Sequence, residues 1–196
     1  MTCSKDSAFA LTVASCLKSG GIAVVPTDTV YGFSGIVDRR GISSFGCDSR
    51  IRKIKGRSES KPLIQLIEKP QDAMLYTDVE IPPALMEKWP GALTVIVPVK
   101  DGCPFVCEGN TVALRCPGDL WLRQVIGISG SPIFSTSVNR SGSPVLEDFD
   151  SIVKEFGSEA DLVVDDGEKR GALPSTLVKL EGDGSWSVLR QGSVIV

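Results

Sequence analysis

Short apolar runs rich in β-branched residues recur along this chain, bounded by glycine or proline, and alternate with segments of helical spacing. The run GIAVVP at 21–26 has the length and the boundaries of a buried strand. Residues 7–18 instead space their apolar side chains as an amphipathic helix that Gly20 and Gly21 end. This alternation predicts an α/β fold, in which helices flank a twisted, mixed sheet. A length of 196 residues suits one domain with a sizeable core.

Five helices and eight strands are predicted in this way. The helices are expected at 7–18, 43–54, 82–89, 120–127 and 148–156. The strands are expected at 21–26, 62–68, 93–99, 111–117, 131–138, 161–167, 175–182 and 185–192. No internal repeat, low-complexity tract or long linker interrupts the series.

The chain contains no histidine, which excludes several kinds of active site. Ser-His-Asp and Cys-His catalysis, the H-E-x-x-H metal site and a histidine general base all need that side chain. An enzyme with this composition is expected to work by positioning and electrostatics, or with Lys, Asp, Glu or substrate groups as bases.

Positive charge is concentrated in RIRKIKGRSESK at 50–61, although the net charge is −3 and the isoelectric point about 5.1. The cluster includes Lys55, Arg57 and Lys61, arranged around Gly56. Arginine offers a planar fork to phosphate and lysine a point charge, so these side chains suit a discrete anion site. A solvated basic face is the commoner fate of such a run. A helix broken at Gly56 and followed at once by an apolar strand favours the anion site.

Polar residues follow two of the apolar runs. PTDTVYG (26–32) comes directly after the first strand, where ligands often bind in α/β sheets, but it is also typical of a turn with satisfied side chains. STSVNRSGSP (135–144) would place Ser137 and Asn139 on one face if the strand continued. The alternative is a strand end followed by a loop, since Asn, Ser, Gly and Pro are turn residues.

Arg115 lies within the apolar strand TVALRCP, where a buried arginine needs an anionic partner. An internal carboxylate and a ligand carboxylate explain it equally well. Arg190 in SVLRQG poses the same question with less force, and Ser175 is unremarkable by itself. Neither the P-loop nor the G-x-G-x-x-G pattern occurs, so any ATP must bind by another arrangement.

Six cysteines, no basic N-terminal leader and no apolar run of membrane-spanning length indicate a cytoplasmic protein. Free, partly buried thiols are the expected state. The pair Cys103 and Cys107 has no second pair or histidine to complete a zinc site.

Seven motifs, taken in order from about Gly20 to the end of the chain, closely resemble the YrdC family of threonylcarbamoyl-AMP synthases. They are PTDTVYG, KGR with KPL, WPGALTVIV, TVALRCP, STSVNRSGSP, PSTLV and VLRQG. The resemblance implies a single YrdC-like domain over 1–196, with its sheet around a large basic cavity. Since VLRQG lies close to Val196, the form without a further C-terminal domain is expected.

The resemblance also implies a reaction. L-Threonine and bicarbonate (or CO2) would give a carbamate that attacks the α-phosphate of ATP and expels pyrophosphate, with Mg2+ on the triphosphate. The product would pass to the machinery that threonylcarbamoylates an adenosine beside the anticodon of certain tRNAs (t6A). Weak RNA binding is a further expectation.

Site residues can be carried over position by position from the same motifs. Those expected to hold threonine and its carbamate are Thr29, Arg115, Ser137 and Ser175. Those expected around ATP are Lys55, Arg57, Lys61, Thr111, Asn139 and Arg190. Lys55 and Arg57 would be catalytic, because they would stabilise charge on phosphorus as pyrophosphate leaves. No protein metal site is expected.

Leu66 departs from the family pattern, which often has a histidine there, near the threonine. This residue keeps open a paralogue acting on another carbamoyl or nucleotide substrate. A non-catalytic RNA-binding module is a second alternative, which the acidic net charge and the few aromatic residues available for base stacking disfavour.

Overall fold

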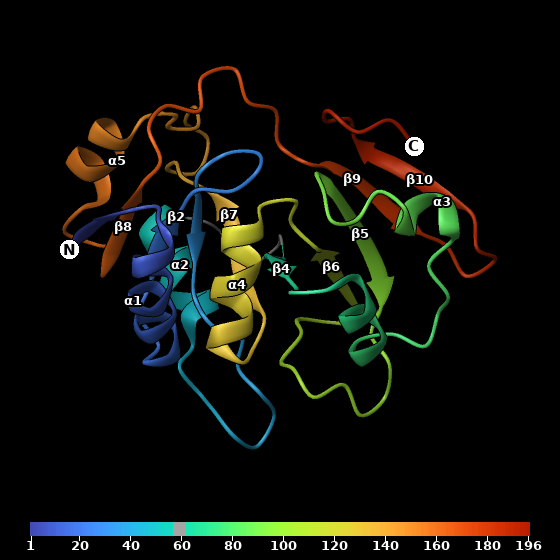
Figure 1. Ribbon diagram of the computed structural model, residues 1–196. Helices are drawn as coiled ribbons and strands as arrows, with labels where there is room; N and C mark the ends of the chain where they lie inside the picture. The colour runs from blue at the N-terminus through green and yellow to red at the C-terminus, as the bar shows by residue number, and fades with distance from the viewer. Residues whose placement is uncertain (57–61) are drawn as a thin grey trace.

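A ten-stranded mixed sheet forms the centre of the computed structural model, which describes residues 1–56 and 62–196 (Figure 1). The strands are β1 (Thr2–Ser4), β2 (Ala23–Val25), β3 (Gly32–Ser34), β4 (Ile64–Leu66), β5 (Leu93–Pro98), β6 (Thr111–Arg115), β7 (Ile133–Ser137), β8 (Leu162–Asp165), β9 (Thr176–Leu180) and β10 (Trp186–Arg190). The helices are α1 (Ser7–Lys18), α2 (Cys47–Lys55), the 3₁₀-helix η1 (Pro70–Leu75), α3 (Pro83–Met86), α4 (Leu120–Ser129) and α5 (Phe149–Phe156).

The strand order is β1-β8-β2-β3-β7-β4-β6-β5-β9-β10. Four neighbouring pairs are parallel (β1 with β8, β2 with β8, β4 with β6, β5 with β9), and the other pairs of the described sheet are antiparallel. The mixed sheet and its flanking helices confirm the predicted α/β fold.

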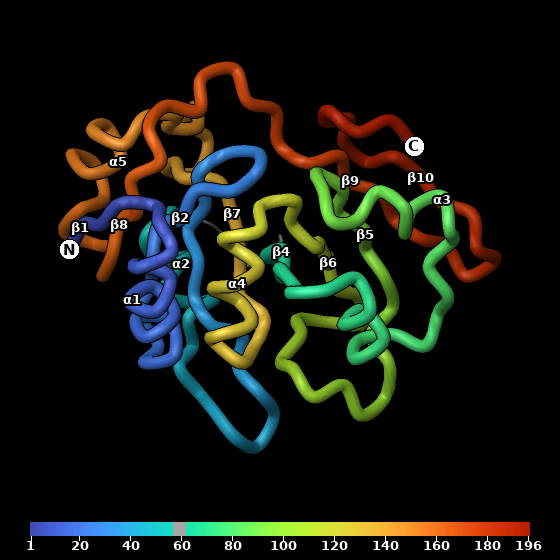
Figure 2. Tube along the Cα trace, in the orientation of Figure 1, coloured from blue at the N-terminus to red at the C-terminus, as the bar shows by residue number. Residues whose placement is uncertain are grey.

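Helices cover both faces of the β1-to-β4 part of the sheet. α1 and α4 lie side by side on one face, where Leu17 and Val125 share a cluster of buried side chains (Figures 1 and 2). α2 and α5 pack into the opposite cluster, in which Phe156 meets Phe33 of β3 edge to face at 4.9 Å between ring centroids. Burial of one apolar face per helix is the main stabilising contribution to such a layered arrangement.

Helix α2 begins at Cys47, four residues later than its predicted start. The reason is local, because both carboxylate oxygens of Asp38 accept backbone N–H groups, from Phe45 at 2.8 Å and from Gly46 at 2.9 Å. Gly46 adopts a left-handed conformation with φ of 62°, which a helical residue cannot share. Residues 43–46 therefore belong to the loop that Asp38 organises.

The predicted helix at 82–89 is also shorter, since α3 ends at Met86. The indole N–H of Trp89 donates to the carbonyl of Leu93 at 2.7 Å, and Pro90 disfavours helical backbone at the residue before it. The sequence missed β1, β3 and η1. β1 and β3 have three residues each, too few to show a period.

All six cysteines carry free thiols, four of them buried and two half-buried, as expected. A search of the helices in residues 1–56 and 62–196 finds none with the length and apolarity to cross a membrane.

Candidate functional site

The loop between β2 and β3 carries the PTDTVYG motif and folds as a self-satisfied turn. Thr27 accepts the Thr29 N–H at 3.0 Å and donates its hydroxyl to the carbonyl of Val30 at 2.8 Å. The Val138 N–H donates to the carbonyl of Tyr31 at 3.2 Å, which ties the loop to the end of β7. The turn interpretation is therefore correct for Thr27, and it leaves the next two side chains able to reach other segments.

Arg115, at the end of β6, is 4% exposed and contacts this loop. Its Nη1 donates to Thr29 Oγ1 at 2.9 Å, and its Nη2 forms an ion pair with Asp28 Oδ1 at 2.5 Å. Its Nε donates to the carbonyl of Gly91 at 3.1 Å. The other oxygen of Asp28 accepts the Gly118 N–H at 2.9 Å. An internal carboxylate thus lies beside Arg115, together with a predicted threonine-binding residue.

Lys55 forms a second group at the end of α2, where Gly56 terminates the helix with φ of 60°. The lysine is 3% exposed, so it does not lie on a solvated face. Its ammonium donates to the carbonyl of Ser137, to the Asn139 carbonyl at 3.1 Å and to Asn139 Oδ1 at 2.8 Å. Ser137 Oγ donates to the same Oδ1 at 2.8 Å. Three predicted site residues meet here.

Ser137 and Asn139 converge for a different reason from the one predicted. β7 ends at Ser137, so strand alternation does not continue to Asn139. Instead, the Asn139 amide nitrogen donates to the carbonyls of Arg140 and Ser143, at 3.0 and 2.8 Å, and the loop turns its oxygen back toward Ser137.

The other basic residues of α2 point to separate partners. Arg50 pairs with Asp161 at 3.0 Å on the surface, whereas Arg52 is buried and pairs with Glu108. Partial burial raises the pKa of the Glu108 carboxyl, although Arg52 opposes the shift. Arg57 and Lys61 lie outside the described residues.

Ser175 and Arg190 form a third group, at the start of β9 and the end of β10. Ser175 Oγ lies 2.7 Å from Thr94 Oγ1 of β5. Arg190 donates to the Ser175 carbonyl through Nε at 3.1 Å and Nη2 at 2.8 Å. Partial burial lowers the pKa of the Arg190 guanidinium, and the positive charge of Arg115 lowers it further. The group around Arg115 and the group around Arg190 are therefore close enough for their charges to interact.

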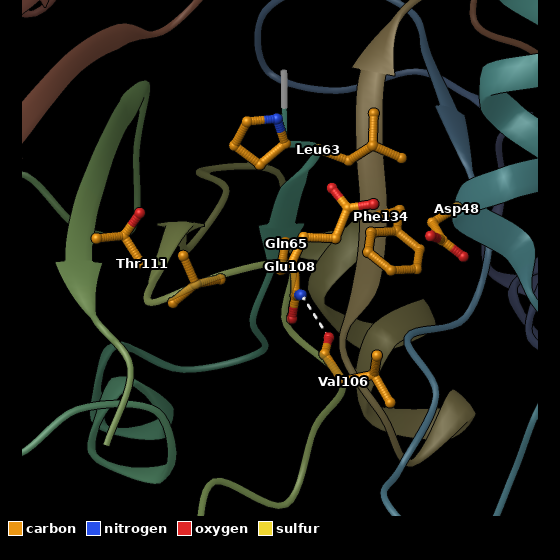
Figure 3. Close-up of a pocket in the computed structure, with 9 residues that line it drawn as sticks. Asp48, Leu63, Gln65, Val106, Glu108, Thr111 and Phe134 are labelled. Carbon is orange, nitrogen blue, oxygen red and sulfur yellow. Dashed lines mark hydrogen bonds between the residues drawn. The ribbon is translucent and has the colours of Figure 1, made fainter. Parts of the chain in front are cut away.

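Thr111 is exposed and lies apart from these groups, at the opposite end of β6 from Arg115. It lines a pocket in which Gln65 donates to the carbonyl of Val106 at 3.2 Å (Figure 3). The described charged residues of this pocket are acidic, Asp48 and Glu108. The predicted large basic cavity stays a prediction.

Leu66 is 1% exposed and belongs to the apolar cluster beneath α1 and α4. In the parallel pairing of β4 with β6 it lies opposite Arg115. Paired residues of neighbouring strands share a face of the sheet, so position 66 adjoins the arginine group.

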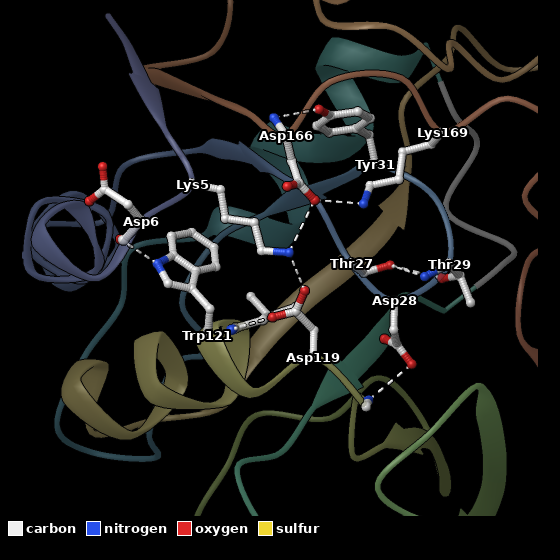
Figure 4. A network of polar contacts seen from close by, with 12 residues as sticks. Lys5, Asp6, Thr27, Asp28, Thr29, Tyr31, Asp119, Trp121, Asp166 and Lys169 are labelled. Carbon is white, nitrogen blue, oxygen red and sulfur yellow. Dashed lines mark hydrogen bonds and ion pairs between the residues drawn. The ribbon is translucent and has the colours of Figure 1, made fainter.

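A chain of charges borders the PTDTVYG loop on its other side (Figure 4). Lys5 bridges Asp119 at 2.5 Å and Asp166 at 3.0 Å, and Lys169 pairs with Asp166 at 2.6 Å. The Asp166 N–H donates to the Tyr31 hydroxyl at 2.8 Å. Burial opposes ionisation of Asp166, but hydrogen bonds from Lys169 and Lys5 outweigh it and lower its pKa. This network fixes Tyr31 from outside the motif.

Sequence patterns assign no functional role to Asp28, Thr94 or Gly118. Asp28 stood inside a recognised motif, where its charge next to two threonines was a usable signal. Thr94 likewise stood inside the WPGALTVIV motif, but its partner Ser175 is 81 residues away and no local pattern joins the two.

Comparisons with known proteins are consistent with these motifs. The family model Sua5_yciO_yrdC, described as "Telomere recombination", matches residues 15–192. A threonylcarbamoyl-AMP synthase of Pyrococcus abyssi is 30% identical over 173 residues, covering 85% of this chain and 49% of the relative. The mouse threonylcarbamoyl-AMP synthase is 29% identical over 194 residues, covering 91% and 65%. The chain thus spans between half and two thirds of these relatives.

Among solved structures, P. abyssi Sua5 complexed with L-threonine superposes with a TM-score of 0.81 at 28% identity. The match covers 94% of this chain and 54% of that one.

Proposed function

The chain belongs to the Sua5/YciO/YrdC family, and from this membership we propose that it makes threonylcarbamoyl-AMP and pyrophosphate from L-threonine, bicarbonate and ATP. In the first step the threonine amine and bicarbonate give a carbamate and water. A carbamate oxygen then attacks the α-phosphorus, and the bond from that phosphorus to the bridging oxygen breaks. Pyrophosphate leaves with the electron pair.

The observation that carries this proposal is that Arg115 and Arg190 both lie beside the start of β5. Arg115 Nε donates to the Gly91 carbonyl, and Arg190 donates to the carbonyl of Ser175, whose hydroxyl contacts Thr94. Arg115 lowers the pKa of Arg190, and both lie beside hydroxyl side chains, Thr29 and Ser175 respectively. Asp28 supplies the single acidic ion-pair partner of the two arginines in the described part of the chain. The pair retains a net positive charge, which suits the carboxylate of an amino acid. The threonine complex of P. abyssi Sua5 supports the same choice of ligand.

The phosphate groups of ATP would bind near Lys55, Ser137 and Asn139. Lys55 would offer its charge to the triphosphate, while Asn139 and Ser137 hold it in place. Electrostatic stabilisation of phosphorus in this way needs no general base, in agreement with a chain that has no histidine. Arg57, Lys61, Arg190 and Thr111 are the other residues proposed around ATP, with Thr111 at the far end of β6.

Mg2+ would enter with ATP, held mainly by phosphate oxygens and water and neutralising charge on the leaving pyrophosphate. Asp48 and Glu108, in the pocket beside Thr111, are oxygen donors of the type Mg2+ accepts, but Glu108 already pairs with Arg52, so no protein metal site is proposed. The product would serve threonylcarbamoyl transfer to tRNA in the cytoplasm.

Pyrophosphate release by the purified protein tests the proposal. ATP, Mg2+ and bicarbonate are supplied with L-threonine, L-serine, glycine or no amino acid, and the adenylate is identified by mass. Release that depends on threonine is the expected result. Absence of release with every amino acid, from folded protein that still binds ATP, would overturn it.

The apolar environment of Leu66 favours one alternative, a paralogue with another acceptor. A histidine beside Arg115 would offer a polar contact, whereas leucine offers none. Release that is stronger with a different amino acid or carbamoyl compound than with threonine would establish the paralogue. Salt-sensitive RNA binding without ATP consumption would instead establish the RNA-binding module.

A further inference from the structure

Asp28 has no role in the reaction as proposed above. Resting on that proposed function, we propose that Asp28 is a positioning residue, which holds the Arg115 guanidinium in the orientation that receives the substrate carboxylate. Its carboxylate would stay on Arg115 throughout, and would not move away when substrate binds.

Both oxygens of Asp28 are held by different loops. Oδ1 accepts Nη2 of Arg115 at 2.5 Å, and Oδ2 accepts the Gly118 N–H at 2.9 Å. A Cβ at position 118 would lie 2.9 Å from Oδ2, closer than side-chain carbons approach. The glycine therefore lets the backbone close on the carboxylate. Two anchors of this kind prevent Asp28 from turning away on its own.

Arg115 retains donors for a ligand in this arrangement. A guanidinium has five N–H groups. The hydrogen bonds to Gly91, Thr29 and Asp28 use three of them in the described structure, one on each nitrogen. One N–H on each terminal nitrogen is left, and each can donate to a carboxylate oxygen. Asp28 and a substrate carboxylate can thus bind the same arginine together.

The charge balance points the same way. Partial burial lowers the pKa of Arg190, and the positive charge of Arg115 adds to the shift. One aspartate offsets one of the two positive charges, so the group keeps a net charge of about +1. That balance suits a ligand group with a single negative charge.

The opposite role is that of a competitor, with Asp28 occupying Arg115 only until substrate arrives. The two roles predict opposite signs for Asp28→Asn, which removes the charge and keeps the shape. Loss of a positioning residue raises the KM for threonine. Loss of a competitor lowers the KM for threonine.

The experiment compares wild-type protein, Asp28→Asn and the control Asp161→Asn in threonine-dependent pyrophosphate release. Asp161 pairs with Arg50 on the surface, so the control also breaks an Arg–Asp pair, but away from this group. The expected result for Asp28→Asn is a KM for threonine raised about tenfold, which is the loss of one charge-assisted hydrogen bond. The KM for ATP should stay within about twofold. An unchanged or lower KM for threonine would overturn the proposal.

A second readout does not depend on activity. The Arg115 Nε–H signal in ¹⁵N NMR spectra, assigned by its loss in Arg115→Lys, should exchange its proton faster in Asp28→Asn than in wild type. Failure of wild type to release pyrophosphate would defeat the proposed function alone, since this readout still reports how firmly the guanidinium is held, through the Nε–H that donates to Gly91. Unchanged exchange would defeat the positioning role alone.

Gly118→Ala serves as the second variant if Asp28→Asn does not fold. The added methyl displaces Oδ2 by a few tenths of an ångström without charge loss, and φ at 118 lies outside the left-handed region. A smaller rise in the KM for threonine and faster Nε–H exchange are expected. Wild-type values for both would contradict the proposal.

Discussion

Lys55 shows how one buried charge can serve both the site and the fold. Its ammonium is held by backbone and side-chain oxygens of residues 137 and 139. Surface lysines have no such constraint, and their removal changes stability little. Substitution of Lys55 should therefore affect catalysis and stability together.

We predict that Lys55→Met abolishes pyrophosphate release and lowers the free energy of unfolding by about 1–3 kcal/mol. Three partly buried oxygens lose their donor, and the reacting phosphate loses its charge partner. Urea unfolding and a pyrophosphate assay measure the two effects. Lys53→Met, which removes an exposed lysine from the same helix, should change neither. Normal turnover in Lys55→Met would refute the site assignment.

A second prediction at the residue scale concerns Arg115. Arg115→Leu should raise the threonine requirement much more than the ATP requirement, because its contacts are with Asp28, Thr29 and Gly91 and not with the Lys55 group. It should also lower the free energy of unfolding by roughly 1–3 kcal/mol, since a partly buried carboxylate loses its partner. The contrast is with Arg50→Leu, at an exposed pair. Equal rises in the threonine and ATP requirements, or a loss of stability alone, would indicate that the Arg115–Asp28 ion pair is only structural.

At the scale of elements, the end of β10 and the start of β9 form one unit. The backbone of Gly192 approaches that of Pro174 and Thr176 so closely that no side chain fits. A Cβ there would lie 2.2 Å from the Pro174 carbonyl oxygen and 2.5 Å from the Thr176 nitrogen. Ser175 lies between these two residues, so the glycine of the VLRQG motif sets its position.

Gly192→Ala should accordingly displace Ser175 and reduce pyrophosphate release at least tenfold, a loss of about 1.4 kcal/mol in transition-state stabilisation. Far-UV circular dichroism should show that the sheet persists, because only the turn after β10 has to move. The matched control is Gly182→Ala, where no atom lies within 4 Å of an added Cβ and the φ is not left-handed. Comparable activity in the two variants would contradict this account.

At the scale of the whole molecule, the Lys5–Asp119–Asp166–Lys169 network joins segments from both ends of the chain. It connects the residue after β1 to the N-terminus of α4 and to the segment that follows β8 (Figure 4). Burial tends to lower the pKa of Lys5, yet hydrogen bonds to Asp119 and Asp166 outweigh it and raise the pKa above the ordinary value. The network therefore makes the free energy of unfolding depend on pH both at acid pH and at alkaline pH.

The expected dependence follows from the directions of these shifts. The depressed pKa of Asp166 contributes stability above the ordinary aspartate pKa of about 3.9, which is lost as pH falls through its folded value. The raised pKa of Lys5 contributes stability below the ordinary lysine pKa, lost as pH rises through its folded value. Urea unfolding from pH 3 to 11 should show both losses in wild type and a weaker acid loss in Asp166→Asn. Identical acid slopes would exclude the network as the cause.

The sequence by itself determined the fold class, most of the elements and the residue types of the site. Apolar periodicity, and glycine and proline at element ends, are local properties, so the chain alone displays them. Thus residues 7–18 form the predicted helix, and Gly56 ends α2 as expected. The grouping of residues within motifs was similarly visible in Ser137 and Asn139.

Only the tertiary structure decided which of these residues meet. Arg115 and Asp28 are 87 positions apart, and Arg190 comes near them through strands that are distant in sequence. Strand order and register set such contacts, and both depend on how the whole core packs. A sequence pattern cannot distinguish an arginine that awaits a ligand from one that already has a carboxylate, because the partner's approach is a property of the assembled sheet.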